Sequence, residues 1–353
     1  MKNLKNLLPI SQNEKINFTK NLGVMLKAGL SLDQSLSILS KQSQNHKFKK
    51  VILNLQKEVQ SGHSLADSLA LYPRIFSQFY INMVRVGEEG GIINQIAKEL
   101  HKQMQKTGRL KSKTKGALIY PAIIIITMII IGVIMMIAVV PKLLDMLSQF
   151  GTQLPWTTKL IIAVSRFLTS RALIIFPAFI ALITALIWFF KSRKGKPIWH
   201  KIIITCPILG KLSREYNNAM LARNLNSLIE SGVPIVEALK TSANTLNNYW
   251  YQKSLETAAK KVQTGKSLFE IMKDYPKLYP PMVTEMIEVG EETGQLNELL
   301  SHIADYYEEE LDQATRNLSV TIEPVLMVFI GGLVTFFALS MLQPMYSILQ
   351  NVG

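Results

Sequence analysis

Three long stretches of this sequence contain no charged residue, and they limit the possible fold more than any other feature. They run from Ala117 to Val140, from Ala172 to Phe190 and from Pro324 to Leu342, over 24, 19 and 19 residues. A helix needs about 20 apolar residues to cross a bilayer, and a buried core helix rarely stays uncharged for so long. The composition agrees, with 48% hydrophobic and only 18% charged residues. The sequence therefore predicts three transmembrane helices.

Lysine and arginine near these stretches predict the orientation of the chain. Seven basic residues between Lys98 and Lys115 precede the first stretch, and five between Lys191 and Lys201 closely follow the second. The loop between them is more sparsely basic, and the tail after the third stretch has no charge. Basic residues flank spans mainly on the cytoplasmic side, so we expect a cytoplasmic N-terminus and a C-terminus outside. No secretory signal peptide is apparent, and the first span is expected to direct insertion.

A second feature is an internal repeat at one fixed offset. Shifting the sequence by 203 residues without a gap aligns its two halves. The shift superimposes these segments: Asn21-Leu22 on Asn224-Leu225, Gly29 on Gly232, Tyr72-Pro73 on Tyr275-Pro276, Val86-Gly87-Glu88-Glu89 on Val289-Gly290-Glu291-Glu292, and Pro121 on Pro324. Chance rarely keeps one register for so long. The repeating unit is therefore a helical domain followed by a span, here called the first copy and the second copy, and the middle span connects them.

Apolar residues in each copy recur at helical spacing, and no convincing β alternation is present. The predicted fold class is all-α: an antiparallel bundle of about six helices in each copy. We expect helices near 13–28, 32–43, 47–61, 64–71, 75–87 and 92–116, with counterparts 203 residues later. Gly29 and Gly232 stand where one helix should end and the next begin, the usual place of a C-cap glycine. Pro121 and Pro324 are expected to have a structural role in the spans.

These observations give a linear organisation of the chain. The expected segments are a tail (1–12), the first cytoplasmic domain (13–116), span 1 (117–140), an external loop (141–171), span 2 (172–190), a basic connector (191–215), the second cytoplasmic domain (216–320), span 3 (321–343) and an external tail (344–353).

No motif of enzymatic chemistry is found. Gly265-Lys266-Ser267 resembles the end of a phosphate-binding loop, but Lys260 stands where that loop needs its first glycine. The single cysteine, Cys206, has no His/Asp constellation beside it, and the five histidines lack metal-ligand spacing. We expect no catalytic residue, cofactor or metal, and no nucleic-acid partner. A transporter or channel component is the alternative, although only isolated residues such as Thr127, Thr184 and Thr335 are polar within the spans. A membrane-embedded enzyme is a third class, without a visible site.

The most suggestive polar motif is a Gly-Glu-Glu-x-Gly corner that ends the predicted fifth helix of each copy. One interpretation is a solvated turn, in which glycines adopt a left-handed backbone and the carboxylates lie near the next helix N-terminus. The other is a docking surface or a cation site. The candidate partner-binding residues are Gly87, Glu88, Glu89 and Gly91 in the first copy and Glu285, Glu288, Gly290, Glu291, Glu292 and Gly294 in the second.

The two helical domains, the three spans and the paired corners resemble the inner-membrane platform proteins of type II secretion and type IV pilus machines. Two further stretches agree with this family: Leu154-Pro155-Trp156-Thr157-Thr158 and Pro207-Ile208-Leu209-Gly210-Lys211-Leu212. The resemblance implies a non-enzymatic protein of the bacterial inner membrane. It also implies that the protein anchors a cytoplasmic assembly ATPase and couples its movements to prepilin or pseudopilin subunits. Other inner-membrane assembly proteins, the lipid bilayer and further copies of the chain are the remaining expected partners.

The two copies differ in charge although they share a helical pattern. Residues 1–117 contain 19 basic and 7 acidic residues, a net charge of +12, whereas residues 201–321 contain 12 and 16, a net charge of −4. The run from Lys98 to Lys115 is explained by topology and by attraction to anionic lipid. Removing it still leaves the first copy basic. We therefore expect the copies to bind different surfaces, either each other across a dimer or two distinct partners.

Overall fold

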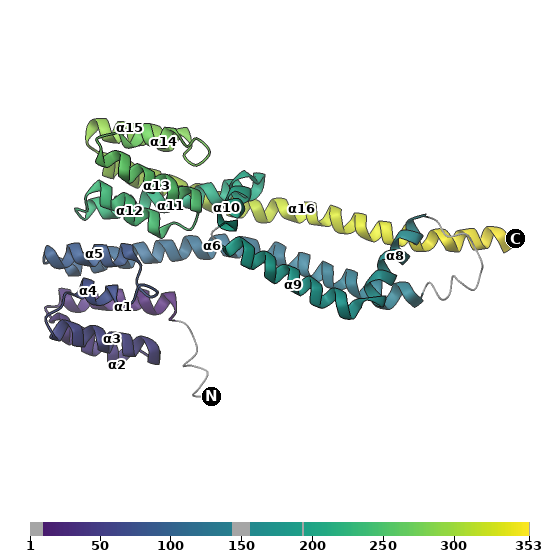
Figure 1. Cartoon of the computed structure of the whole chain (residues 1–353), viewed down its shortest axis with the longest axis horizontal. Coiled ribbons are helices and arrows are strands. Elements are labelled where there is room, and N and C mark those ends of the chain that lie inside the picture. Colours follow the sequence, from purple (N-terminus) through teal and green to yellow (C-terminus); the bar gives the residue numbers. More distant parts are fainter. Residues whose placement is uncertain (1–9, 143–155, 193, 353) are drawn as a thin grey trace. The chain divides into compact units, whose positions relative to one another are not determined.

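The computed structural model describes residues 10–142, 156–192 and 194–352. All regular secondary structure assigned among these residues is helical (Figure 1). The chain divides into two compact units. Unit 1 is made of Met1–Lys113 and His200–Asp312, and unit 2 of Thr114–Trp199 and Gln313–Gly353. Both copies therefore contribute to unit 1. The prediction of an all-α protein is confirmed for the described residues.

The first copy forms six helices, close to the predicted ranges. They are α1 (Gln12–Lys27), α2 (Leu32–Gln42), α3 (His46–Gln60), α4 (Leu65–Ala70), α5 (Gln78–Glu89) and α6 (Ile93–Ile134). Side chains that accept backbone N–H groups begin these helices: Ser11 and Ser31 form capping boxes with Glu14 and Gln34. Gly29 lies in the turn between α1 and α2 and has a φ of +85°, a backbone conformation that glycine adopts without strain. Gly29 lies directly after Ala28, the C-cap residue of α1.

The helices of the second copy follow the same register. They are α11 (Pro207–Glu230), α12 (Ile235–Thr245), α13 (Tyr249–Gln263), α14 (Leu268–Lys273), α15 (Pro281–Thr293) and α16 (Leu296–Val352). From α12 to α16 each helix begins 203 residues after its counterpart. Gly232 has φ +87°, like Gly29. α11 is the exception, because it begins nine residues before the predicted start at residue 216, directly after α10 (Gly195–Thr205).

Corresponding apolar residues form the core of each copy. Leu22, Leu36, Ile52 and Leu65 are buried in the first copy, and Leu225, Leu239, Leu255 and Leu268 occupy the same positions, also buried, in the second. In both copies the second helix packs against the third, and the fourth against the fifth. Burial of a leucine or isoleucine stabilises a fold by about 1.5 to 3 kcal/mol, so the repeated apolar positions account for the repeated fold.

Unit 2 contains the rest of α6 and α16 together with three further elements. These are η1 (Met135–Val139), α8 (Trp156–Ser170) and α9 (Ala172–Lys191). The predicted external loop 141–171 lies partly outside the described residues, and its described part contains α8, a helix that we had not predicted. Likewise, α16 continues to Val352 through the segment interpreted as a tail. Pro121 lies inside α6 and Pro324 inside α16, so neither proline ends its helix.

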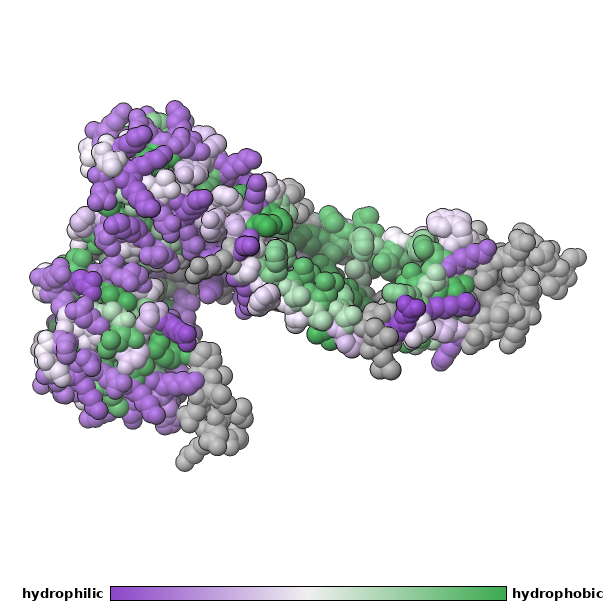
Figure 2. Space-filling view, viewed as in Figure 1, coloured by the Kyte–Doolittle hydropathy of each residue, from purple (hydrophilic) through white to green (hydrophobic). Residues whose placement is uncertain are grey.

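The helices of unit 2 have the composition of membrane spans. By length and composition, Ile93–Lys142 and Leu296–Ser340 each contain a segment that could cross a membrane, whereas the described apolar segment of α9, Pro177–Lys191, is shorter than this length criterion requires. Figure 2 shows hydrophobic residues gathered over this unit and hydrophilic residues over the surface of unit 1. Between α6 and α16 lies an apolar cavity of about 570 Å³, lined by residues such as Ile123, Ile131, Leu333 and Phe337.

Candidate functional site

The first acidic corner binds the beginning of a helix that precedes it in the chain. Both carboxylate oxygens of Glu88, near the end of α5, accept backbone hydrogen bonds at the N-terminus of α4. Leu65 N–H donates to Oε1 at 2.6 Å and Ala66 N–H to Oε2 at 3.0 Å. The first N–H groups of a helix have no partner within it and carry a partial positive charge. Glu88 therefore caps α4.

The second corner repeats this arrangement. Glu291 accepts hydrogen bonds from Leu268 N–H at 2.7 Å and from Phe269 N–H at 3.0 Å, at the start of α14. The hydroxyl of Ser267 also donates to Glu291, at 2.6 Å. The interpretation that the corner carboxylates lie near the next helix was therefore wrong for Glu88 and Glu291. Each caps a helix 22 to 24 residues earlier in its own copy.

The glycines of the corners have two different roles. Gly91 and Gly294 adopt positive φ angles of 66° and 71°, as the turn interpretation predicted. Gly87 and Gly290 lie inside α5 and α15 and do not have positive φ. A Cβ on Gly87 would lie 2.8 Å from Ile96 Cγ1, and one on Gly290 would lie 2.9 Å from Leu296 Cα. These two glycines let the following helix approach closely.

The second glutamate of each corner remains available to a partner. Glu89 and Glu292 are exposed, and their carboxylates make no hydrogen bond or ion pair with any residue in the described ranges. Glu285 is also exposed on α15, and Glu288 is half-buried. Among the described residues no group of three or more His, Cys, Asp or Glu side chains is placed to hold a metal ion. The exposed glutamates Glu89, Glu285 and Glu292 are therefore the candidate partner-binding residues best placed for docking.

Sequence reasoning did not anticipate that the two copies pack against each other within one chain. We call this contact the seam. α5 of the first copy packs on α12 of the second. The amide of Asn82 donates to Thr241 Oγ1 at 2.7 Å, and the amide of Gln103 donates to Asn224 Oδ1 at 2.9 Å. Both hydrogen bonds are buried, which makes them costly to break.

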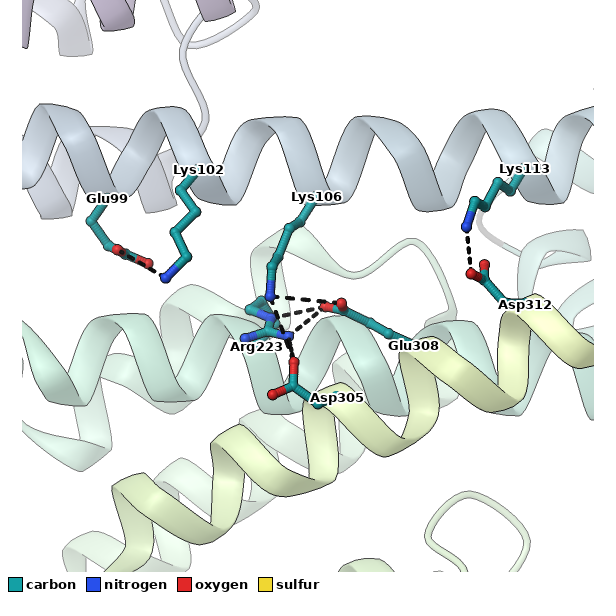
Figure 3. A network of polar contacts seen from close by, with 8 residues as sticks. All are labelled: Glu99, Lys102, Lys106, Lys113, Arg223, Asp305, Glu308 and Asp312. Carbon is teal, nitrogen blue, oxygen red and sulfur yellow. Dashed lines mark hydrogen bonds and ion pairs between the residues drawn. The ribbon is translucent and has the colours of Figure 1, made fainter.

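A cluster of charges crosses the seam beside these hydrogen bonds (Figure 3). Arg223, on α11, is buried and donates to Asp305 and to Glu308, the latter at 2.9 Å from Nε. Lys106, on α6, lies 3.6 Å from Asp305 and 3.8 Å from Glu308. Burial would raise the pKa of the Asp305 carboxyl, but the hydrogen bond and charge of Arg223 outweigh it and lower that pKa. Two cations and two carboxylates thus join three helices.

The seam changes the interpretation of the basic run before the first apolar stretch. Lys106 pairs with Asp305 and Glu308, and Lys113 pairs with Asp312. Some of the lysines that we assigned to lipid and topology therefore contact the acidic copy. The opposite charges of the copies meet within one chain, a possibility that the sequence analysis did not consider.

The seam is not packed continuously. A cavity of about 350 Å³ lies between the copies, lined by residues that include Lys15, Arg74, Gln103, Asn224 and Thr245. Oε1 of Gln103 accepts no hydrogen bond from another described residue, although the side chain is buried. Polar side chains from both copies therefore line part of the seam.

Glu215 is an unusual carboxylate of unit 1. It is almost fully buried on α11, and Oε2 has no hydrogen-bond partner among the described residues. Burial raises its pKa to about 7, and the nearby Glu310 adds to this, while Lys211, 3.6 Å away, and Arg214 act in the opposite direction. No sequence signal distinguished this glutamate from its exposed neighbours.

Comparison with known proteins agrees with this architecture. The sequence model of one family, type II secretion system (T2SS), protein F, matches residues 18–141 and again residues 221–344. The chain belongs to this family. The two matched segments of the protein F family begin 203 residues apart, which is the offset of the internal repeat.

Individual members of the family align along almost the whole chain. The type IV pilus assembly protein PilC of Myxococcus xanthus is 34% identical over 94% of this chain and 79% of its own length. PilC of Thermus thermophilus is 33% identical over 95% of this chain and 82% of its own. The type II secretion system protein F of Aeromonas hydrophila is 30% identical over 97% and 88%. The predicted family resemblance is confirmed.

Proposed function

We propose that this protein is the inner-membrane platform of a type IV pilus or type II secretion machine. Its relatives at 30 to 34% identity carry the names of pilus assembly and secretion proteins, and this observation carries the proposal. In the proposed arrangement unit 1 is cytoplasmic and receives the assembly ATPase. The apolar helices of unit 2 lie in the membrane beside prepilin or pseudopilin subunits, and the protein itself catalyses no reaction.

The structure offers physical support for a coupling role. α6 and α16 each contain residues of both units, so one continuous helix leads from each copy into an apolar segment. The apolar cavity between α6 and α16 has a lining suited to an apolar helix or an acyl chain. The exposed Glu89 and Glu292 give unit 1 two equivalent acidic positions for a partner with basic side chains.

Deletion of the gene tests the proposed function directly. We expect the deletion strain to lose surface fibres in electron micrographs, or its secreted proteins, and to regain them when the wild-type gene is supplied. Retention of both fibres and secretion would contradict the proposal.

The contact with the ATPase can be tested separately with the full-length protein. Glu89→Arg/Glu292→Arg is expected to reduce co-purification of the assembly ATPase from detergent-solubilised membranes. Glu256→Arg, an equally acidic exposed position on α13, is the matched control. Equal recovery of the ATPase with both variants would exclude the corners as its docking site.

The proposal includes three spans, which the basic flanks of the apolar stretches and the shorter apolar helix α9 support. Phosphatase and fluorescent-protein fusions after Ser148, Ser192 and Gly353 are expected to report an external, a cytoplasmic and an external position, respectively. A cytoplasmic Gly353 fusion would exclude three spans.

A further inference from the structure

The seam uses different surfaces on the two copies. It joins α5 and α6 of the first copy to α11 and α12 of the second, and ion pairs also connect α6 to α16. A two-fold arrangement would also join α15 to α2, but among the described residues these helices make no contact comparable to that of α5 with α12. Figure 1 shows α2 and α15 on opposite sides of unit 1. The contact is therefore heterologous, and each copy keeps one face of the seam type that no other described element covers in the same way.

The unused face of the second copy lies on α15 and α16. Its residues are Met282, Glu285, Met286, Val289, Tyr306 and Glu309. At the offset of the repeat they correspond, in this order, to Phe79, Asn82, Met83, Val86, Gln103 and Lys106 of the first copy. Val289 is 48% exposed and Tyr306 44%, whereas Gln103, at the position of Tyr306, is only 4% exposed. This outer face is apolar with acidic residues at its edge. We call it the acidic face.

The unused face of the first copy lies on α1 and α2. Its residues Lys20, Asn21, Val24 and Ile38 correspond to Arg223, Asn224, Ser227 and Thr241. Of these, Asn224 and Thr241 accept hydrogen bonds across the seam. Val24 is 60% exposed, while its counterpart Ser227 is 1% exposed. Exposed Lys20 and Lys41 add positive charge. We call this surface the basic face.

We propose that the acidic face of one chain binds the basic face of a second copy of the same chain. The contact repeats the geometry of the seam between molecules. The seam itself shows how such a face is covered, because α5, the counterpart of α15, is buried against α12. A head-to-tail contact of this kind builds a closed ring or an open row of copies.

The charges of the two faces favour this partner. Within the seam, Lys106 and Arg223 are both cations and share the carboxylates of Asp305 and Glu308. At the corresponding places between chains stand Glu309 and Lys20, which have opposite charges. Glu285 replaces Asn82, and the basic Lys41 lies one turn beyond Ile38. Complementary charges at the edge of an apolar contact raise both its specificity and its rate of association.

Disulfide trapping in native membranes tests the contact. Two full-length chains carry different tags, and both contain Cys206→Ser. One chain carries Ile38→Cys and the other Glu285→Cys, the counterparts of Thr241 and Asn82, which are hydrogen-bonded in the seam. Mild oxidation is expected to give a disulfide-linked dimer that contains both tags. Ile38→Cys with Glu256→Cys, exposed on α13, is the matched control. Asn82→Cys/Thr241→Cys in one chain verifies the seam by an internal cross-link.

Absence of the mixed dimer, or an equal yield from the control pair, would overturn the proposal, as would adducts with other proteins only. A second measurement uses the mass of the full-length protein in detergent as a function of concentration. Val24→Glu is expected to weaken self-association at least about tenfold. Leu71→Glu changes an equally exposed residue, 61% against 60%, outside both faces, and is expected to leave the mass unchanged. If Val24→Glu self-associates as strongly as the wild type, the proposal is overturned. The test does not depend on the platform function, which the deletion strain addresses.

Discussion

Glu291 holds the start of a helix that begins 23 residues earlier, because its Oε1 accepts the backbone N–H of Leu268 at 2.7 Å. Glu88 does the same for Leu65 in the first copy, at 2.6 Å. Two glutamates of a repeated acidic motif thus stabilise the fold, and their neighbours Glu89 and Glu292 point to no described partner. The motif combines a structural residue and an exposed one.

The first prediction separates these two residues. Glu88→Gln and Glu291→Gln keep the size of the side chain but remove its charge and one strong acceptor. We expect each to lower the free energy of unfolding by about 1 to 2 kcal/mol. Thermal unfolding of the purified full-length protein measures the effect, with Glu89→Gln and Glu292→Gln as controls. Equal melting temperatures for all four variants would show that capping contributes nothing.

The second prediction concerns the close helix approach at the corners. Gly87→Ala and Gly290→Ala place a Cβ within 2.8 and 2.9 Å of atoms of Ile96 and Leu296. The expected destabilisation is about 1 to 3 kcal/mol, because the next helix must move. Gly116→Ala is the control, since no atom lies within 4 Å of its Cβ and its φ is not positive. A neutral Gly290→Ala variant would contradict the proposed role of this glycine.

A third prediction addresses the ion cluster of the seam. Arg223→Met leaves Lys106 as the one cationic partner of Asp305 and Glu308 among the residues that the structure describes. We expect a loss of about 2 to 3 kcal/mol and faster hydrogen exchange in α5 and α12, which the seam protects. Lys102→Met removes a 4.0 Å contact with Glu99 from an exposed lysine, and is expected to cost little. Unchanged exchange in Arg223→Met would mean that the cluster does not hold the copies together.

The fourth prediction is a pH dependence caused by Glu215. Its folded pKa of about 7 lies above its ordinary value of 4.5, so the folded protein binds this proton more tightly than the unfolded chain. The resulting stabilisation is complete below pH 4.5 and is lost as the pH rises through 7. Glu215→Gln is expected to remove this dependence and to be more stable than the wild type at pH 8, by about 1 to 2 kcal/mol after solvent screening. Parallel stability curves of the two proteins between pH 5 and 8 would refute the assignment.

The helices of the two copies could be predicted from sequence because their signals are local. Apolar spacing and the positive-φ glycines Gly29 and Gly232 placed α2 to α5 and α12 to α15 within about three residues of their observed bounds. α8 was missed because Trp156–Ser170 mixes charged and apolar residues and falls between two stronger apolar signals. The start of α11 was missed because the counterparts of Pro207 to Glu215, residues 4–12, precede the predicted first helix.

The roles of the polar residues could not be predicted, because their partners are distant in the chain. Nothing in the motif distinguishes Glu88 from Glu89 until α4 folds back onto α5. Arg223 meets Glu308 across 85 residues, and Asn82 meets Thr241 across 159. The net charges of the copies indicated an electrostatic attraction, but only the folded chain shows that part of it acts within one molecule.

The pair formed by Lys113 and Asp312 also sets an order in time. The two residues are 199 positions apart, so at about 5 to 20 residues per second Asp312 is synthesised roughly 10 to 40 s after Lys113. In the proposed membrane topology, Lys106 and Lys113 are therefore uncompensated while α6 is inserted, and they can act with full charge on the orientation of the nascent helix. Once the second copy is complete, the same ammonium groups are taken over by Asp305, Glu308 and Asp312. One set of lysines thus serves biogenesis first and the finished fold afterwards.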